Sequence, residues 1–462
     1  MRRRIQHVHF VGIGGIGMCG IAELLLSQGY RVSGSDLRES PSVARLRALG
    51  IRVSIGHEEA NLGQADVLVY SSAVNANNPE IREAEARKIP VIRRAEMLAE
   101  LMRLKEGVAV GGSHGKTTTT SLIAHILDAA GLDPTAVIGG RVQAPGGDAT
   151  GARLGSSDIL VAEADESDGS FLRLTPVIAV ITNIDPEHLD HYGSFEAVQD
   201  AFVSFSNGVP FWGVTVLCAD HPGIQAILPR LTRRVTTYGF SSQAELVADR
   251  IEVIDFGMRF RVLLRGEDLG PVSLRLPGQH NIANALAALA VALELGVPFA
   301  TGAEALGGFP GIERRFEFRG SARGVRFVDD YAHHPSEIRA TLAAARAAHR
   351  GRIVSVFQPH RYSRTRDCFE DFTSAFNDTD VLIVTEIYPA GEPKLPGIEA
   401  QLLVEAIRSH GHRDAHFIGD FEGVAENLPT RLREGDLVLT LGAGNISALG
   451  PLLLERLEEE QQ

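Results

Sequence analysis

The sequence contains few cysteines and no long apolar run. Its three cysteines, Cys19, Cys218 and Cys368, are widely separated among 462 residues. An odd number of scattered cysteines argues against a disulfide framework and favours reduced thiols in a cytoplasm. No apolar run reaches the roughly 18 to 20 residues that cross a bilayer. We therefore expect a soluble, cytoplasmic protein without a transmembrane segment.

Basic charge is also scarce. The chain has 45 Lys and Arg against 58 Asp and Glu, which gives a net charge of -13. This balance disfavours broad attraction to nucleic acid or to an anionic membrane, so we predict neither as a partner. Residues 1–4 are basic enough to begin a signal peptide, but His7, His9 and a glycine-rich segment follow where its apolar core would have to lie. We predict no export signal, and local features must hold any anionic ligand.

Strands alternate with helices in three successive series. At roughly 150 residues per domain, the length suggests about three domains. The alternation restarts near residues 106 and 313, which predicts domains at 1–106, 107–312 and 313–462. Such alternation is typical of α/β domains with parallel sheets. We expect Rossmann-like first and third domains, and a central domain whose mostly parallel sheet is accompanied by a small antiparallel sheet, because RIEVIDFGMRFRVLLRGEDLG alternates in polarity.

A first glycine loop lies in HFVGIGGIGMCG, between an apolar strand and a helix. Gly12, Gly14 and Gly17 have the G-x-G-x-x-G spacing that is typical of dinucleotide sites. Asp36 follows the second strand, nineteen residues after Gly17, where a dinucleotide enzyme binds ribose. The residues therefore leave a nicotinamide-dependent redox enzyme open. The motif is weak, however, because a helix N-terminus binds pyrophosphate whatever group the pyrophosphate carries.

A second glycine loop, in VAVGGSHGKTTTT, indicates a triphosphate site. In such a loop backbone N–H groups cradle phosphate oxygens, while Lys116 reaches the terminal phosphates and the Thr117 hydroxyl can hold Mg²⁺. Val110 stands where the full motif has glycine, so the loop is a shortened version, and an ordinary glycine turn is the less favoured alternative. A hydride-transfer enzyme has no evident need of this loop. Two loops therefore favour two phosphorylated ligands.

Two further segments offer metal ligands. Glu163 ends an apolar strand in ILVAEADES, and Glu166 is among the acids that follow it. Carboxylates suit Mg²⁺, and we favour Glu163 over a purely solvated acidic loop. In TNIDPEHLDHYG, His188 and His191 are three residues apart and could share a zinc ion on a helical turn. Because no third strong ligand is evident, we favour His188 as one ordinary ligand, with a structural role as the alternative.

In this order the motifs resemble those of the Mur ligase family over essentially the whole chain. The segments that carry the resemblance are HFVGIGGIGM, GGSHGKTTTT, AEADESDGSFL, TNIDPEHLDHYG, GQHNIANALAA, RRFEFRG, DDYAHHPSEI and QPHRYSRTRD. The resemblance implies a three-domain enzyme with a central P-loop ATPase domain. It also implies that the enzyme joins L-alanine to the lactyl carboxylate of UDP-N-acetylmuramate and converts ATP to ADP and phosphate. A monomer or a weak homodimer is expected.

The resemblance also implies roles for individual residues. The positions expected to bind ATP are Gly112, Ser113, His114, Gly115, Lys116, Thr117, Thr118, Asn281, Asn284, Arg315 and Asp330. Those expected to bind the UDP-sugar are Gly14, Gly15, Ile16, Gly17, Ser35, Asp36, Ser71, Ser72 and His114. Those expected to face the amino acid are Tyr331, His333, Arg361 and Arg364. Mg²⁺, or Mn²⁺ in its place, is expected at Thr117, Glu163 and His188, and the expected catalytic residues are Lys116, Glu163, His188, Arg315 and His333.

Several of these residues have plainer alternatives when read alone. Asn281 starts an alanine-rich helix, where asparagine is a frequent N-cap. The segment PHRYSRTR reads as a solvated basic turn, and His333 as a structural or capping residue. Family members that carry a carbamylated lysine after the HLD histidine differ from this chain, since residues 185–213 contain no lysine. That absence suits the alanine-adding branch and leaves the ligands of a second metal ion open.

The expected reaction explains why these residue types are needed. A carboxylate is a poor electrophile, so the γ-phosphoryl group of ATP must first convert it to an acyl phosphate. Lys116, Arg315 and Mg²⁺ would stabilise the charge that spreads over the phosphoryl oxygens. Arg361 or Arg364 could bind the alanine carboxylate, and His333 or a water could accept the ammonium proton. The alternatives are a recycling ligase that attaches a tripeptide and a sensor that binds ATP and UDP-sugar without ligation.

Overall fold

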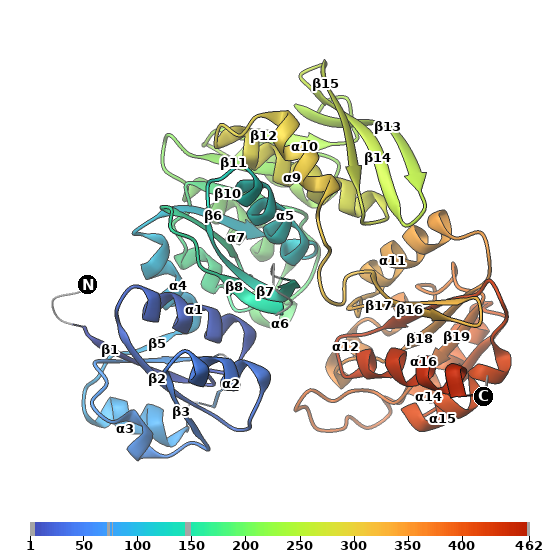
Figure 1. Cartoon of the computed structure of the whole chain (residues 1–462), viewed down its shortest axis with the longest axis horizontal. Coiled ribbons are helices and arrows are strands. Elements are labelled where there is room, and N and C mark those ends of the chain that lie inside the picture. The colour runs from blue at the N-terminus through green and yellow to red at the C-terminus, as the bar shows by residue number, and fades with distance from the viewer. Residues whose placement is uncertain (1–4, 72–73, 76, 144–148, 460–462) are drawn as a thin grey trace. The chain divides into compact units, whose positions relative to one another are not determined.

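The computed structural model describes residues 5–71, 74–75, 77–143 and 149–459, which include every predicted site residue except Ser72. These residues form two compact units. The first comprises residues 1–249, 261–272 and 283–309, and the second comprises residues 250–260, 273–282 and 310–462. The chain can be followed through the elements labelled in Figure 1. The boundaries of three separate domains remain a prediction.

The N-terminal part contains a five-stranded parallel sheet in the order β3-β2-β1-β4-β5. Its strands are β1 (His7–Val11), β2 (Arg31–Asp36), β3 (Arg52–Ile55), β4 (Val67–Tyr70) and β5 (Val91–Arg93). Its helices are α1 (Ile16–Ser27), α2 (Pro41–Ala48), η1 (Glu59–Leu62), α3 (Pro79–Ala86) and α4 (Arg94–Met102). The strand order reverses between β1 and β4, and ligands of open α/β sheets bind beyond the carboxyl ends of the strands at such a point. The first glycine loop follows β1 at this place.

The central part contains a ten-stranded sheet in the order β15-β14-β13-β12-β11-β10-β6-β9-β7-β8. Its strands are β6 (Glu106–Gly111), β7 (Thr135–Gln143), β8 (Ala149–Arg153), β9 (Ile159–Glu163), β10 (Ile178–Ile181), β11 (Val214–Cys218), β12 (Val235–Gly239), β13 (Leu246–Ile254), β14 (Gly257–Leu264) and β15 (Glu267–Leu274). Its helices are α5 (Lys116–Ala129), η2 (Ser170–Arg173), α6 (Leu189–Tyr192), α7 (Phe195–Asn207), α8 (Pro222–Ile227), η3 (Leu228–Arg230), α9 (Gln279–Glu294) and α10 (Phe299–Gly307). Strands β6, β9 and β10 are parallel neighbours, so the segments that follow them emerge at one edge of the sheet.

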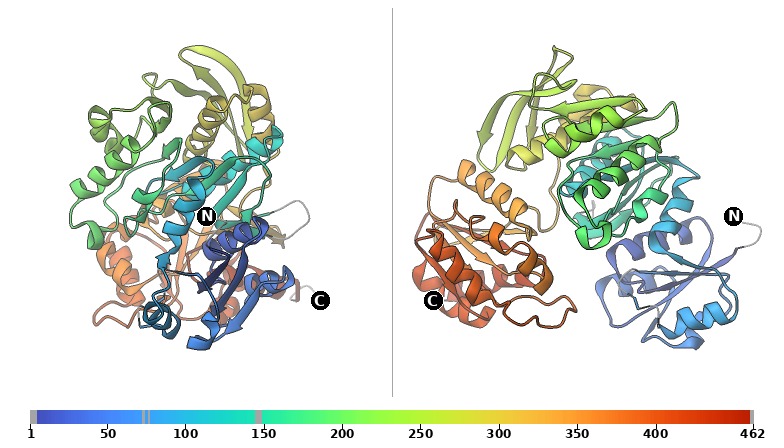
Figure 2. Two further views of the ribbon diagram at one scale, coloured as in Figure 1. Left: turned by 90° about the vertical axis from the view of Figure 1, so that its left-hand side faces the viewer. Right: turned by 180° about the vertical axis from the view of Figure 1, so that it is seen from behind.

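The C-terminal part contains a six-stranded sheet in the order β16-β17-β21-β18-β19-β20. Its strands are β16 (Glu317–Ala322), β17 (Val325–Asp330), β18 (Ile353–Phe357), β19 (Val381–Val384), β20 (Ala415–Phe417) and β21 (Leu437–Leu441). Its helices are α11 (Pro335–Ala348), α12 (Tyr362–Asp367), α13 (Phe369–Phe372), α14 (Ala400–Ser409), α15 (Phe421–Asn427), η4 (Pro429–Arg431), η5 (Ile446–Ala448) and α16 (Leu449–Glu459). Figure 2 gives two further views of these elements, which are drawn in orange and red.

Two apolar cores lie on opposite faces of the C-terminal sheet. Successive side chains of a strand point to opposite faces. Accordingly, Ile353 and Phe357 of β18 belong to a core that includes residues of α11 and α14, whereas Val354 and Val356 belong to a core that includes residues of α15 and α16. A strand that is buried on both faces reads as a continuous apolar run, which is why β18 and β21 are so apolar in sequence. Both faces of the sheet are therefore covered by helices.

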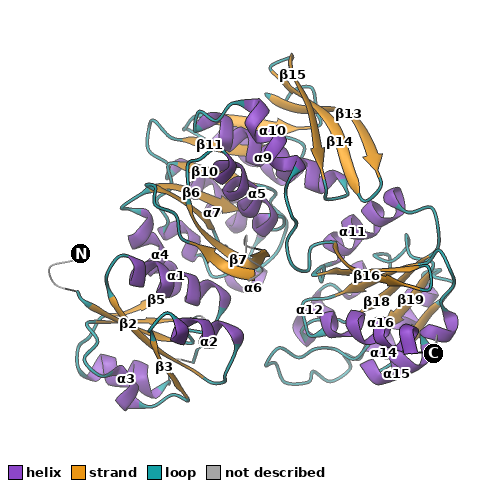
Figure 3. Cartoon of the chain, in the orientation of Figure 1, coloured by secondary structure: helices purple, strands orange, loops and turns teal. Residues whose placement is uncertain are grey.

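The predicted α/β fold with mostly parallel sheets is confirmed. Figure 3 shows the alternation of strands and helices along most of the chain. One detail differs, because β13, β14 and β15 extend the central sheet instead of forming a separate small one. Two residues join β13 to β14 and two join β14 to β15, so these neighbours are antiparallel hairpins, as the alternating polarity predicted. Among the described residues, Cys19, Cys218 and Cys368 form no disulfide bond.

A search of the described residues found no helix with both the length and the apolar character needed to traverse a bilayer.

Candidate active site

The first glycine loop is closed by hydrogen bonds from β2. The N–H groups of Gly12 and Ile13 donate to the Ser35 carbonyl at 2.9 and 3.0 Å. The Gly14 N–H donates to Asp36 Oδ2 at 2.8 Å. The Asp36 carboxylate thus accepts a hydrogen bond from Gly14, which was predicted to bind the UDP-sugar. Asp36 lies next to the loop as predicted, and its role toward the ligand remains a prediction.

The Ser35 side chain points into the N-terminal part instead. Its hydroxyl is fully buried, donates to Glu80 Oε2 at 2.9 Å and lies 2.9 Å from His57 Nδ1. Glu80 is itself fully buried, and its Oε2 lies 2.6 Å from His9 Nε2. The part of Ser35 that faces the loop is its carbonyl oxygen. The hydroxyl of Ser35 is thus not exposed to a ligand, and a UDP-sugar contact at this residue stays a prediction.

The other predicted UDP-sugar residues follow β1 and β4. Gly15 is the N-cap of α1, Ile16 begins that helix, and the Ser71 N–H donates to the carbonyl of Val11 at 3.3 Å. Ser72 lies outside the described residues. Gly17 packs against the guanidinium of a residue that the sequence did not single out, because a Cβ at Gly17 would lie 3.0 Å from Arg94 Nη1. Arg94 begins α4 and places a cation beside the first turn of α1.

The second glycine loop links β6 to α5 through a left-handed turn. Gly115 is the N-cap of α5 and has a φ of +81°, and a Cβ there would lie 2.6 Å from Asn284 Oδ1. Glycine is therefore required for both the turn and the close approach. Thr117 and Thr118 follow in the first turn of α5, where Thr117 is half-buried and Thr118 is buried. The turn aims the first N–H groups of α5 away from the helix, as an anion site needs.

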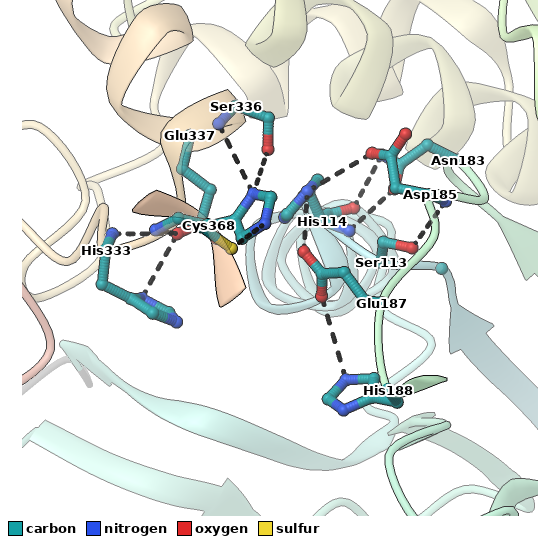
Figure 4. Close-up of polar contacts among 12 residues, drawn as sticks. Ser113, His114, Asn183, Asp185, Glu187, His188, His333, Ser336, Glu337 and Cys368 are labelled. Atoms are coloured by element: carbon teal, nitrogen blue, oxygen red, sulfur yellow. Dashed lines mark hydrogen bonds and ion pairs between the residues drawn. The ribbon is translucent and has the colours of Figure 1, made fainter. Parts of the chain in front are cut away.

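The loop following β10 braces this turn. The Ser113 and His114 N–H groups donate to Asn183 O at 3.2 Å and to Asn183 Oδ1 at 2.7 Å. The Asp185 N–H donates to Ser113 Oγ at 2.9 Å. Figure 4 shows Asn183 and Asp185 beside Ser113 and His114. Because these contacts fix both loops, Ser113 and His114 serve the shape of the predicted ATP loop.

Asp185 lies between two imidazoles. Its carboxylate is 3.4 Å from Nε2 of His114 and 3.4 Å from Nε2 of His221. Hydrogen bonding to His114 and then to His221 holds the pKa of Asp185 well below its usual range. His221 precedes α8 and was not predicted. The anion thus ties the P-loop to the segment that follows β11.

Lys116 makes three contacts inside the protein. Its Nζ donates to the carbonyl oxygens of Gly112 at 2.6 Å and Ser113 at 3.1 Å, and to Glu166 Oε1 at 2.9 Å. Burial opposes the charged ammonium, but the adjacent Glu166 carboxylate keeps the pKa of Lys116 above its ordinary value. Lys116 is therefore a charged residue at the loop, as predicted, and it is paired with an acid that the sequence analysis had not selected.

Three ligand atoms of the central part lie close enough together to hold a metal ion. Atoms of Glu166, Glu187 and His188 are within 4.8 Å of one another. Glu163, the predicted ligand, instead accepts the Gly139 N–H at 2.8 Å. The predicted set of Thr117, Glu163 and His188 shares His188 with this cluster. The acidic ligands that the structure gathers around His188 were not predicted.

The two asparagines of α9 are buried and have local partners. Asn281 Nδ2 donates to the Pro277 carbonyl at 2.7 Å, at the start of the helix. Asn284 Oδ1 accepts the Thr119 hydroxyl of α5 at 3.2 Å. Asn284 thus lies directly against the Gly115 turn, whereas the contact of Asn281 is local to its own helix start. Contacts of either residue with ATP stay predictions.

At the carboxyl end of β17 a buried acid organises the backbone. Asp330 accepts the N–H groups of Phe316 at 2.7 Å and Ala332 at 2.8 Å, and the Thr341 hydroxyl at 3.2 Å. Burial raises the pKa of Asp330 to about 6, although the nearby Arg315 guanidinium opposes the rise. These hydrogen bonds fix the backbone of the segment that follows β17.

The residues predicted to bind the amino acid begin with Tyr331, which follows Asp330. The Arg315 guanidinium lies 5.1 Å from the centre of the Tyr331 ring, and the Tyr331 ring meets that of His333 edge to face with 5.3 Å between centres. His333 Nδ1 lies 3.0 Å from the Tyr331 carbonyl, so this nitrogen carries the proton and Nε2 is the acceptor. Burial lowers the pKa of His333 to about 4. The imidazole is therefore neutral near pH 7, as a proton acceptor must be.

Arg361 and Arg364 flank the start of α12. Arg361 is exposed and has a φ of +69°, and Arg364 Nη1 lies 3.1 Å from His360 Nδ1. The preceding α11 begins with a capping box in which the His334 and Glu337 side chains take part. His334 Nε2 also lies 3.6 Å from Cys368 Sγ, drawn in Figure 4 with Ser336 and Glu337. The arginines thus lie on the segment predicted to face the amino acid.

Family comparisons match most of the chain. The Mur ligase family, catalytic domain, matches residues 7–106, the Mur ligase middle domain matches residues 110–292, and the Mur ligase, glutamate ligase domain, matches residues 314–444. The chain belongs to the Mur ligase family. The resemblance inferred from the sequence motifs is thereby confirmed.

Individual Mur ligases match nearly the full length. A UDP-N-acetylmuramate–L-alanine ligase from Sorangium cellulosum is 57% identical over 460 residues, 99% of this chain and 97% of the relative. One from Myxococcus xanthus is 56% identical over 98% of this chain and 96% of the relative. The crystal structure of a UDP-N-acetylmuramate–alanine ligase from Thermotoga maritima matches with a TM-score of 0.83 and 30% identity, over 98% of this chain and 99% of that one. A murein peptide ligase from Psychrobacter arcticus shares the fold, with a TM-score of 0.71 and 24% identity over 98% of each chain.

Proposed function

We propose that this protein is an ATP-dependent ligase that joins L-alanine to the lactyl carboxylate of UDP-N-acetylmuramate and releases ADP and phosphate. The observation that carries the proposal is the position of Lys116 in the second glycine loop, where it pairs with Glu166. It is supported by the match to a UDP-N-acetylmuramate–L-alanine ligase, which is 57% identical over 99% of this chain. The product would be a precursor of peptidoglycan. The three substrates are UDP-N-acetylmuramate, L-alanine and ATP.

The residues near Lys116 fit a divalent ion. Glu166 Oε2 is a buried carboxylate oxygen with no hydrogen-bond partner among the described residues, and Glu166 belongs to the cluster with Glu187 and His188. Carboxylate oxygens are the ligands that Mg²⁺ prefers, and Mn²⁺ also accepts imidazole. Glu166, Glu187 and His188 would hold the ion, with Thr117 and Glu163 as the positions taken from the family. When bound, Mg²⁺ neutralises the triphosphate charge.

In the first half of the proposed reaction the chain binds and polarises ATP. N–H groups at the start of α5 and the Lys116 ammonium surround the phosphates, where charge develops as the γ-phosphoryl group moves to the lactyl carboxylate. One carboxylate oxygen forms a bond to phosphorus while the bond from phosphorus to the ADP oxygen breaks. The resulting acyl phosphate has a good leaving group that the free carboxylate lacks.

In the second half the neutral amine of alanine attacks the acyl carbon and expels phosphate. Arg361 or Arg364 would bind the alanine carboxylate, since a guanidinium can donate two parallel hydrogen bonds to it. The ammonium of alanine must lose a proton before it attacks. His333 is neutral near pH 7 because burial lowers its pKa to about 4, and its Nε2 can accept that proton, although a base of this pKa is weak. A water molecule remains the alternative acceptor.

Phosphate release by the purified protein tests this proposal. The assay contains UDP-N-acetylmuramate, ATP and Mg²⁺, and each amino acid or an L-alanine-containing tripeptide is added in turn. The proposal predicts release that requires every component and is fastest with L-alanine. Faster release with the tripeptide would indicate a recycling ligase instead. Binding of ATP and the UDP-sugar without release would indicate a sensor, and binding of a nicotinamide cofactor, tested separately, would indicate the redox alternative.

A cytoplasmic location and a monomeric or weakly dimeric state complete the proposal. Free thiols at Cys19, Cys218 and Cys368 are compatible with a reducing compartment.

A further inference from the structure

Among the described residues, the Lys116 ammonium has three hydrogen-bond acceptors within the protein. A lysine –NH₃⁺ group has three donors. In this structure they are used by the carbonyl oxygens of Gly112 and Ser113 and by Glu166 Oε1. The side chain is 19% exposed, so water adds little around it. A triphosphate that binds Lys116 must therefore displace at least one of these three partners.

Glu166 is the partner that a phosphate would displace. The two carbonyl oxygens are neutral and lie on the loop that precedes Lys116, so they can stay when the loop binds an anion. Glu166 comes from the segment after β9, is an acid paired with the ammonium and is only 3% exposed. An unscreened carboxylate and a phosphate oxygen on the same ammonium repel each other strongly. The ammonium can serve both anions only in turn.

The other oxygen of Glu166 indicates where the carboxylate goes. Oε2 is buried and has no hydrogen-bond partner in the described part of the chain, and Oε1 is also 3.7 Å from His188 Nε2. Buried carboxylate oxygens without partners are costly, so such an atom marks a place that a cation or donor fills. His188 and Glu187 complete a group of ligand atoms that suits a divalent ion.

We propose that Glu166 is a positioning residue that holds Lys116 in the nucleotide-free protein, releases the ammonium to ATP, and transfers its own carboxylate to the divalent ion that enters with the nucleotide. This exchange rests on the proposed ATP-dependent function. No covalent bond changes in it. Its consequence is that ATP without a divalent ion binds poorly, because the released carboxylate is then left beside the phosphates without a counter-ion.

The substitution Glu166→Gln separates this role from simple support of the fold. Glutamine has the same shape but no charge, so Lys116 is free for the phosphates and no carboxylate repels them. We expect metal-free ATP, titrated calorimetrically in the presence of a chelator, to bind about tenfold more tightly than to the natural protein. Loss of a merely structural contact would weaken binding. The gain in ATP affinity on adding Mg²⁺ should be correspondingly smaller in the variant.

Asp165 provides a matched control. It precedes Glu166 on the same segment and is 47% exposed, and its side chain lies 3.5 Å from Arg94, with no contact to Lys116 among the hydrogen bonds and ion pairs of the described residues. Asp165→Asn removes a carboxylate that acts on Lys116 only through space, and metal-free ATP affinity should rise by about twofold or less, well below the effect of Glu166→Gln. The shorter Glu166→Asp keeps the charge but loosens the contact, and about threefold tighter binding is expected. This variant decides the question if Glu166→Gln does not fold.

A double-mutant cycle with Lys116→Met identifies the partner. If the exchange is correct, Glu166→Gln tightens ATP binding much less when Lys116 is already absent. Equal tightening in both backgrounds would mean plain charge repulsion and would overturn the exchange. Unchanged or weaker metal-free binding by Glu166→Gln, in a natural protein that releases phosphate normally, would also overturn it. A natural protein that neither binds ATP nor releases phosphate would instead refute the proposed function.

Discussion

The two glycine loops share a backbone arrangement but differ in the charged side chain beside it. Each follows a buried parallel strand and opens a helix, at α1 and at α5. In the first loop a carboxylate, Asp36, accepts the Gly14 N–H. In the second loop an ammonium, Lys116, lies inside the turn against the buried Glu166. The backbone alone supplies anion binding, whereas a positioned ammonium can follow charge that moves during a reaction.

The comparison teaches that the loop backbone does not reveal which loop takes part in chemistry. The proposed division of labour follows from side chains: the first loop anchors the UDP-sugar and the second transfers a phosphoryl group. The end of β17 differs from both, because burial lowers the pKa of His333 to about 4 and raises the pKa of Asp330 to about 6. Four predictions follow the differences between these regions, from the largest expected effect to the smallest.

Replacing the lysine tests whether the second loop performs the transfer. Lys116→Met removes the ammonium that should stabilise the moving phosphoryl group, and we expect kcat for phosphate release to fall about a thousandfold. The affinity for the UDP-sugar, measured by calorimetry, should stay within about twofold because the first loop is intact. A variant that loses UDP-sugar binding and keeps its turnover would reverse the two assignments.

Acid unfolding tests the contrast with the end of β17. The pKa of His333 is about 4 in the folded protein and 6.5 ordinarily, so its contribution to stability is complete above pH 6.5 and is lost as the pH falls through 4. The difference corresponds to about 3 kcal/mol. The raised pKa of Asp330, about 6, acts in the opposite direction: its contribution is complete below 3.8 and is lost as the pH rises through 6.

We therefore expect His333→Gln to remove the part of the free energy of unfolding that His333 loses in acid. Between pH 6.5 and 4 the free energy of unfolding, from urea titrations, should fall by about 3 kcal/mol less in His333→Gln than in the natural protein. Identical pH profiles of the two proteins would show that the pKa of His333 is the same in the folded and the unfolded protein.

The glycines that begin the two helices give a matched pair. Gly115 has a φ of +81°, and a Cβ there would approach Asn284 Oδ1, whereas Gly15 has a φ of -63° and its nearest neighbour would be 3.5 Å away. Gly115→Ala should lower the free energy of unfolding by about 2 kcal/mol, and Gly15→Ala should change it by about 0.5 kcal/mol or less. Denaturant titration measures both. Equal costs would remove the structural difference between the loops.

The smallest effect concerns the acid of the first loop. Asp36→Ala removes the acceptor of the Gly14 N–H, and the residue is predicted to bind the UDP-sugar. We expect KM for UDP-N-acetylmuramate to rise about tenfold while KM for ATP is unchanged, because a hydrogen bond to a charged group contributes on this scale. Steady-state kinetics distinguishes the two constants. A rise confined to KM for ATP would contradict the division between the loops.

The sequence predicted most of the fold because its signals are local. Apolar runs with punctuating glycines indicated parallel strands followed by helices, and the motifs indicated the family. The alternating segment after residue 250 predicted hairpins, but its joining to the central sheet depends on the pairing of β12 with β13, where Tyr238 lies opposite Leu246. Only two residue pairs join β12 to β13, and so short a pairing leaves no pattern of its own in the sequence, so that detail could not be predicted.

The site was predicted less completely because contacts around Lys116 join separate segments. The strand end indicated Glu163 as a metal ligand, which stays a prediction, but nothing in the sequence indicated that Glu166, three residues later, pairs with Lys116. One acidic cluster offers several carboxylates, and only the path of the backbone after β9 decides which of them turns inward. Arg94 at Gly17 and His221 at Asp185 were missed for the same reason. The residue types also do not show that the Ser35 carbonyl accepts hydrogen bonds from the first loop, because every residue has a carbonyl group.

Isotope transfer tests the proposed reaction most directly. UDP-N-acetylmuramate labelled with ¹⁸O in its lactyl carboxylate is incubated with the protein, ATP, Mg²⁺ and L-alanine, and the inorganic phosphate is analysed by mass spectrometry. Activation through an acyl phosphate predicts one labelled oxygen in each phosphate released during ligation. Unlabelled phosphate accompanied by the ligated product would contradict it.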